Sequence, residues 1–140
     1  MAVADNSIRT VLALDVGEAR VGVALANTVA RIAHPSGALP RTERIFDDIA
    51  ALCEREHVDK ILLGLPRGMQ GQDTPQTEAV RAFGQELATR LDLPQEWQDE
   101  AVTSVQAEAE LKQRKRPYTK GDIDALAATY ILEDYFHAAV

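Results

Sequence analysis

Acidic side chains at the ends of apolar segments are the residues of this chain best placed to do chemistry. Asp15 follows an apolar run at residues 11–14 and lies at the end of an expected buried strand. Burying a carboxylate without a partner carries a large free-energy cost, so Asp15 requires a cation, a metal or strong hydrogen-bond donors. A salt bridge to Arg20, just across the expected hairpin, is the competing structural explanation.

Two more acidic positions are candidates. Asp99-Glu100 lies where the last short strand gives way to a helix, and strand ends of open α/β sheets are common ligand sites. Asp124 falls on the apolar face of the final helix, so we expect it to point toward the sheet. Asp122 lies on another face and forms a capping pattern with Thr119, which is a sufficient structural role.

Metal binding is the chemistry that such a set of carboxylates favours. Carboxylates that converge from different elements would repel each other unless hard cations lay between them. Oxygen ligands, without a second cysteine or suitably spaced histidines, favour Mg²⁺ or Mn²⁺ over zinc. The histidines are scattered, which is typical of surface or structural positions: His34, His57 and His137.

The elements that must position these carboxylates follow from apolar runs and turn residues. Strands are expected at residues 11–16, 20–27, 31–39, 60–65 and 95–100, with Trp97 pointing inward in the last. Helices are expected at residues 42–57, from Thr74-Pro75 to Pro94, at 103–113 and at 121–137. This order predicts an α/β fold, a five-stranded mixed sheet flanked by helices on both faces.

Length and composition favour one cytoplasmic domain. The 140 residues have the size of a single domain, in which residues 1–9 are expected to form a flexible N-terminal extension. No apolar run is long enough to cross a membrane, and the N-terminus lacks a signal-peptide core. Cys53 is the single cysteine and falls on an apolar helical face, so we expect it to be buried and structural.

A basic cluster lies between the last two expected helices. The net charge of −7 argues against nucleic-acid binding driven by the overall field, but not against a local patch. Five of the fifteen basic residues fall within nine positions: Lys112, Arg114, Lys115, Arg116 and Lys120. This density in an acidic protein favours contact with substrate phosphates, and a solvated loop is the alternative.

Four separated segments resemble one known family. They are LALDVGEARVGVALAN, ILLGLPRGMQGQDTPQTEAVRAFGQEL, WQDEAVTSVQAEAEL and DIDALAATYILEDYF, in that order. Across almost its whole length the chain is similar to the YqgF (RuvX) family of pre-16S rRNA nucleases, also described as Holliday junction resolvase-like proteins. The resemblance implies an RNase H-like fold.

The resemblance also implies roles for particular residues. Asp15, Glu100 and Asp124 correspond to the acidic active-site residues of the family, and are the expected catalytic residues and metal ligands. Residues 64–66 and the loop that follows them, with Arg67, are implied to border the substrate groove. Ala101 departs from the family pattern, which usually has an arginine there that pairs with carboxylates or grips a phosphate.

Two functions from different classes follow as expectations. The first is phosphodiester hydrolysis with Mg²⁺ or Mn²⁺, either in 5′-end processing of pre-16S rRNA or on Holliday junction-like branched DNA. The second is a noncatalytic nucleic-acid or ribosome-maturation binding module, which Ala101 and the acidic net charge favour. Both a monomer and a homodimer are compatible with the sequence.

Overall fold

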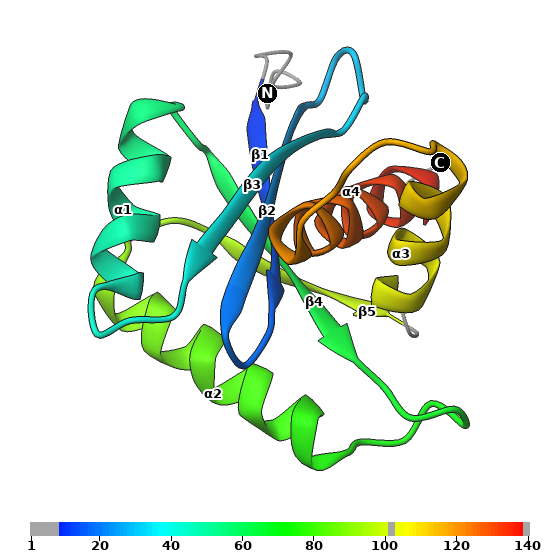
Figure 1. Ribbon diagram of the computed structural model, residues 1–140. Helices are drawn as coiled ribbons and strands as arrows, with labels where there is room; N and C mark the ends of the chain where they lie inside the picture. Colours follow the sequence, from blue (N-terminus) through cyan, green and yellow to red (C-terminus); the bar gives the residue numbers. More distant parts are fainter. Residues whose placement is uncertain (1–8, 101–102, 139–140) are drawn as a thin grey trace.

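An antiparallel hairpin starts the fold. In the computed structural model, which describes residues 9–100 and 103–138, β1 (Thr10–Val16) pairs with β2 (Arg20–Asn27) along its whole length (Figure 1). The predicted turn at residues 17–19 is closed by a hydrogen bond of 2.9 Å from the Gly17 amide to the Arg20 carbonyl. The extension predicted at residues 1–9 lies, apart from Arg9, outside the described residues.

Parallel strands complete the sheet on the other side of β1. β4 (Lys60–Pro66) pairs parallel with β1, and β5 (Gln95–Glu100) pairs parallel with β4. β3 (His34–Pro40) pairs antiparallel with β2, so the strand order is β3-β2-β1-β4-β5. The predicted five-stranded mixed sheet is therefore confirmed.

Helices cover both faces of this sheet. α1 (Ile45–Arg55) and α2 (Pro75–Arg90) pack on one face, and α4 (Lys120–Ala138) packs on the other (Figure 1). α3 (Thr103–Gln113) lies against the outer side of α4. None of the described helices is both long and apolar enough to cross a membrane.

Alternation along β1 divides its side chains between two cores. Leu12 and Leu14 face α1 and α2, whereas Val11 and Ala13 face α4. Since successive side chains of a strand point to opposite faces, Asp15 falls on the face of Val11 and Ala13. The functional candidate at the end of β1 thus lies beneath α4.

Local hydrogen bonds move two predicted boundaries. β3 begins at His34 rather than at residue 31, because the Asn27 side chain accepts from the amides of Val29 and Ala30 and holds them in a turn. The first helix begins at Ile45 rather than at residue 42, because the Thr42 carbonyl accepts from the Ile45 amide and closes a preceding turn. The other expected elements agree within a few residues.

Two single-residue expectations concern the face of α1 and α2. Cys53 is buried in this core, as predicted. Trp97 faces α2 and its ring lies against Gly84, but 40% of the residue is exposed. The exposure follows from the position of β5 at the edge of the sheet, where a large ring has neighbours on only one side.

Candidate active site

Asp15 is a carboxylate with glycines on both sides. On one side it pairs with Gly22 of β2. On the other side Leu14 pairs with Leu63 of β4, so the next residue of β4, Gly64, lies beside Asp15. Its carboxylate makes no hydrogen bond or ion pair with any residue that the structure describes. Burial, and after it the charge of Asp124, raises the pKa of Asp15 to about 6. A nearby cation would stabilise the charged form of such a carboxylate, so this environment suits a metal ligand.

Gly22 brings the final helix close to Asp15. A Cβ atom at Gly22 would lie 2.0 Å from the backbone oxygen of Asp124, so no other residue type fits without moving α4. The helix can therefore approach β2 directly opposite Asp15. The prediction that Asp124 points toward the sheet is consistent with this contact, and its side chain is only 19% exposed.

Arg20 pairs with Asp124 and not with Asp15. Its Nε donates to Oδ2 of Asp124 at 2.6 Å. The salt bridge considered for Asp15 from the sequence is therefore wrong. Arg20 lies beyond Val21, which pairs with the last residue of β1, so its side chain reaches along β2 to the helix instead. A guanidinium consequently lies within the acidic site, whereas Ala101 lies outside the described residues.

Glu100 is buried with one oxygen unsatisfied. The residue is 8% exposed, and its Oε1 has no hydrogen-bond partner among the residues that the structure describes. Burial, followed by the carboxylates of Asp134, Asp15 and Asp99, raises the pKa of Glu100 to about 9. A Cβ at Gly64 would lie 3.5 Å from Cγ of Glu100, so the glycine of the intervening strand leaves room for this side chain.

Asp134 is the acidic neighbour that the sequence reasoning did not single out. After burial it is the largest influence on Glu100. The signal was present, because Asp134 follows Asp124, Ala127 and Ile131 at the spacing of one helical face.

The donor set fits a hard divalent cation. Only carboxylate oxygens are offered, and Oε1 of Glu100 is an orphaned buried acceptor of the kind a cation satisfies. Among residues 9–100 and 103–138 no three acidic, histidine or cysteine side chains form a complete metal cluster. One reason is that Asp124 is turned to Arg20. Asp15, Glu100 and Asp124 are thus the residues that could hold a metal, with Asp124 released from its ion pair.

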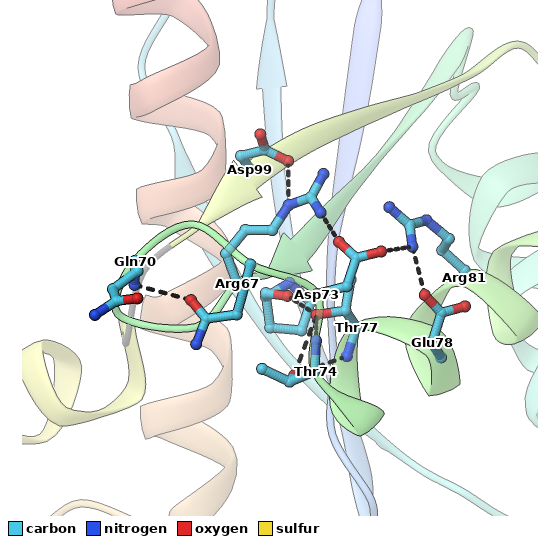
Figure 2. A network of polar contacts seen from close by, with 10 residues as sticks. Arg67, Gln70, Asp73, Thr74, Thr77, Glu78, Arg81 and Asp99 are labelled. Atoms are coloured by element: carbon cyan, nitrogen blue, oxygen red, sulfur yellow. Dashed lines mark hydrogen bonds and ion pairs between the residues drawn. The ribbon is translucent and has the colours of Figure 1, made fainter.

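Arg67 belongs to a polar network beside Glu100. Figure 2 shows its guanidinium between Asp99 and Asp73, with a distance of 3.1 Å from Nε to Oδ1 of Asp99. Arg81 also contacts Asp73, at 2.6 Å, and so ties the network to α2 (Figure 2). The backbone amide of Arg67 donates to the carbonyl of Glu100 at 3.1 Å. The prediction that Arg67 contacts substrate stays a prediction, while these bonds fix the end of β5.

The loop after β4 is anchored at both ends. Thr74 caps α2 by accepting from the Thr77 amide, and the fully buried Thr77 hydroxyl donates to the Pro66 carbonyl (Figure 2). The helix start that was predicted at Thr74-Pro75 is confirmed. Because Pro66 pairs with Glu100 across the two strands, the cap of α2 also steadies the acidic site.

The basic cluster lies at the end of α3 and in the loop that leads to α4. Arg114 donates to Glu110 at 2.5 Å. The other four basic side chains have no ion-pair partner among the residues described: Lys112, Lys115, Arg116 and Lys120. In a protein of net charge −7, these are the cations free to meet an anionic ligand. The capping pair of Thr119 and Asp122, predicted for the start of α4, is present in both directions.

A groove lies beside Asp124, between Arg20, α3 and the start of α4. It has a volume of about 280 Å³ and is lined by Arg20, Val105, Glu108, Lys120, Ile123 and Asp124. Val105 is 66% exposed there. The groove therefore offers cations and apolar surface immediately beside Asp124.

Comparison with solved structures defines the class of fold. The structure of T. thermophilus RuvC in complex with a Holliday junction substrate is similar with a TM-score of 0.57 and 15% sequence identity. The similarity covers 94% of this chain and 95% of that one. The fold is thus a RuvC-like RNase H fold, and it carries acidic residues at the ends of its parallel strands.

Comparison of sequences then gives the family. The chain belongs to the RuvX family, described as Holliday junction resolvase, which it matches over residues 9–138. A relative from Chloroflexus aggregans, named "Putative pre-16S rRNA nuclease", is 42% identical over 93% of this chain and 94% of its own length. A relative with the same name from Maridesulfovibrio salexigens is 38% identical over 92% of this chain and 98% of its own.

Proposed function

We propose that this protein hydrolyses phosphodiester bonds of nucleic acid with the help of divalent metal ions, and that its substrate is the precursor of 16S rRNA. The observation that carries the proposal is a pair of acceptors without partners among the residues described, the half-buried carboxylate of Asp15 and the buried Oε1 of Glu100, on the sheet face that α4 covers. The names of the RuvX relatives support the choice of substrate. Processing of such a precursor would take place in the cytoplasm.

The three carboxylates share the task of holding metal in this proposal. Asp15, Glu100 and Asp124 would hold Mg²⁺ or Mn²⁺, which when bound would activate water and stabilise the leaving oxygen. In the hydrolysis, a bond forms between water oxygen and phosphorus, the bridging P–O bond breaks, and the leaving oxygen takes a proton. Glu100, with a pKa of about 9, keeps a proton at neutral pH until a cation replaces it.

Basic residues bind the substrate in this proposal. Lys112, Arg114, Lys115, Arg116 and Lys120 hold phosphates that flank the cleaved bond, so binding weakens as salt rises. Arg20 adds a positive charge next to Asp124 and can turn to a substrate phosphate when a cation takes over that carboxylate. Arg67 holds the end of β5, and with it Glu100, through Asp99.

Cleavage assays on purified protein test the proposal. Labelled 5′ fragments of pre-16S rRNA, plain single strands and four-way DNA junctions are incubated with Mg²⁺, with Mn²⁺ or with EDTA. We expect metal-dependent cleavage of the rRNA fragments, at least a thousandfold slower in Asp15→Asn and in Asp124→Asn. Asp47→Asn, on the exposed side of α1, is the matched control and should cleave at the normal rate. Unchanged cleavage in both site variants would disprove the site.

A noncatalytic binding module is the second candidate. The ion pair between Arg20 and Asp124, which keeps a carboxylate from a metal, favours it, as does the alanine at position 101. A binding module requires Asp15→Asn to bind rRNA and to support ribosome maturation as well as the parent protein does. Faster cleavage of four-way junctions than of rRNA would instead make branched DNA the substrate.

A further inference from the structure

A second cavity lies on the other side of the start of α4 from the groove beside Asp124. It has a volume of about 280 Å³ and is enclosed by the edge strand β3, the end of α3, the basic loop and the first turns of α4. Its chemistry is set by six residues: Leu111, Arg114, Arg116, Tyr118, Asp122 and Leu126. This volume is at the low end for a small-ligand site and suits one flat ring system.

The cavity is apolar at its base and charged at its rim. Leu126 is buried, and Leu111 is partly buried against it. Tyr118 is also partly buried and lines the same space, which gives a flat aromatic surface. This combination of an apolar base and an aromatic wall is the one that proteins use to stack a nucleobase.

The two guanidinium groups of the cavity differ in their attachment. Arg114 is paired with Glu110, whose second oxygen accepts from the Tyr130 hydroxyl at 3.1 Å, so this ion pair orients the Arg114 guanidinium before any ligand arrives. Arg116 has no ion-pair partner among the residues described. A paired and an unpaired cation at one rim suit a ligand that carries phosphate.

Asp122 contributes an acceptor to the same cavity. Its Oδ2 accepts from the Thr119 amide at 2.9 Å, which leaves Oδ1 available for the amino or imino hydrogen of a base. A ligand that bears both an anionic group and hydrogen-bond donors therefore matches the rim better than an inorganic anion. A nucleotide has this combination.

The cavity and the groove beside Asp124 lie on different sides of the first turns of α4 and share no lining residue. Asp122 lines the cavity, whereas Asp124, two residues on, lines the groove. A strand of nucleic acid that contacts both therefore crosses the start of α4. A stacked, paired base cannot enter such a cavity without leaving its duplex.

We propose that this cavity, between Tyr118, Arg116 and the base formed by Leu111 and Leu126, binds one unstacked base of a single-stranded segment of the substrate. It rests on the proposed function in that the substrate is taken to be a nucleic acid. The cavity makes the protein a reader of single-stranded segments, so a fully paired duplex binds less tightly than a strand with a free nucleotide.

An abasic scan tests the cavity without any need for cleavage. Fluorescently labelled single-stranded RNA of the pre-16S 5′ region is bound in EDTA, and one nucleotide at a time is replaced by an abasic one. Fluorescence anisotropy should show weaker binding at one position only, by roughly five- to a hundredfold, as is usual on loss of a stacked base. Tyr118→Ala should lower the affinity for intact RNA by the same factor. The variant should then bind intact RNA and RNA with the abasic nucleotide equally well.

Matched variants separate the cavity from general charge. Lys115→Ala removes an unpaired cation from the same loop outside the cavity, and should weaken all RNA and duplex probes equally. Arg116→Ala should weaken single strands further than duplexes, and Tyr118→Phe should keep full binding. Melting temperatures show whether each variant is folded. A uniform effect of every abasic position would refute base binding in the cavity. Equal losses of RNA affinity in Tyr118→Ala and Lys115→Ala would refute it too.

The outcomes for cavity and nuclease are distinct. An abasic effect at one position without any metal-dependent cleavage would support base binding in the cavity and refute the nuclease activity. Metal-dependent cleavage without a position-specific abasic effect would refute base binding in the cavity and leave the nuclease activity standing. Failure of the parent protein to bind any RNA would refute base binding in the cavity as well.

Discussion

The two faces of the central sheet share the same strands but have opposite contents. The face under α1 and α2 is filled by large apolar side chains, such as Leu14, Leu63 and Phe83. The face under α4 has glycines and small alanines at the same height, together with Asp15 and Glu100. Alternation along each strand allows both, so one face stabilises the fold while the other can hold a polar site at a cost in stability.

Removing a large side chain from the apolar face should have the largest effect on stability. Leu63 is fully buried among α1, α2 and their strands. We expect Leu63→Ala to lower the free energy of unfolding by about 2–5 kcal/mol. Urea denaturation measures this change in the free energy of unfolding. A loss below 1 kcal/mol would mean that this face is not the stabilising one.

Adding a methyl group to the other face should disturb the site as well as the fold. Because a Cβ at Gly22 meets backbone of Asp124, Gly22→Ala should cost about 3 kcal/mol and separate Asp124 from Asp15. Gly64→Ala meets the flexible end of Ile131 and should cost less. Urea denaturation and cleavage assays compare the two variants. Equal losses in the free energy of unfolding would contradict the inference that Gly22 permits the close approach of α4.

Neutralising Asp15 should stabilise the protein in the absence of metal. Its pKa is raised from 3.8 to about 6, so the folded state binds more protons than the unfolded state and loses stability as pH rises between these values. The penalty is complete above pH 7, nearly absent below pH 3, and amounts to about 3 kcal/mol at ~1.4 kcal/mol per pKa unit. Asp15→Asn should therefore have the higher melting temperature in EDTA at pH 8, and no advantage at pH 3. A lower melting temperature at pH 8 would show that the carboxylate has a stabilising partner.

Among the variants that change stability, breaking the network at Arg67 should have the smallest effect. Arg67→Ala removes a partly exposed ion-pair network, so we expect a loss of about 1 kcal/mol. Arg116→Ala, which removes an unpaired cation, should leave the melting temperature unchanged but weaken RNA binding. If Arg67→Ala weakened RNA binding as strongly as Arg116→Ala did at equal stability, Arg67 would be a substrate contact after all.

Local patterns in the sequence sufficed for most of the fold. The apolar runs located β1, β4 and the central position of Asp15, and the Thr74-Pro75 pair located the start of α2. These features depend on neighbours within a few residues, through alternation, capping and turn formation. The boundaries that moved, at His34 and Ile45, were set by hydrogen bonds of Asn27 and Thr42, whose partners in the loop were not considered.

Partners across the molecule could not be found in this way. Arg20 is nearer in sequence to Asp15 than to Asp124, yet it pairs with Asp124, because register carries it past the end of β1. Asp134 affects Glu100, and Arg67 joins Asp73 to Asp99, only after α2, α4 and β5 have been brought together. Such contacts depend on distances between elements, which spacing along the chain does not contain.

For this protein, the sequence by itself determined which carboxylates lie at the ends of buried strands and on the inner face of the last helix. Periodicity fixes the face on which a side chain lies, and it did so for Asp15 and Asp124. Only the tertiary structure decided that Gly22 lets α4 approach, that Asp15 and Oε1 of Glu100 have no partner in the described part of the chain, and that the basic loop borders a cavity. These properties depend on how closely elements pack and on what is left unpaired when they do.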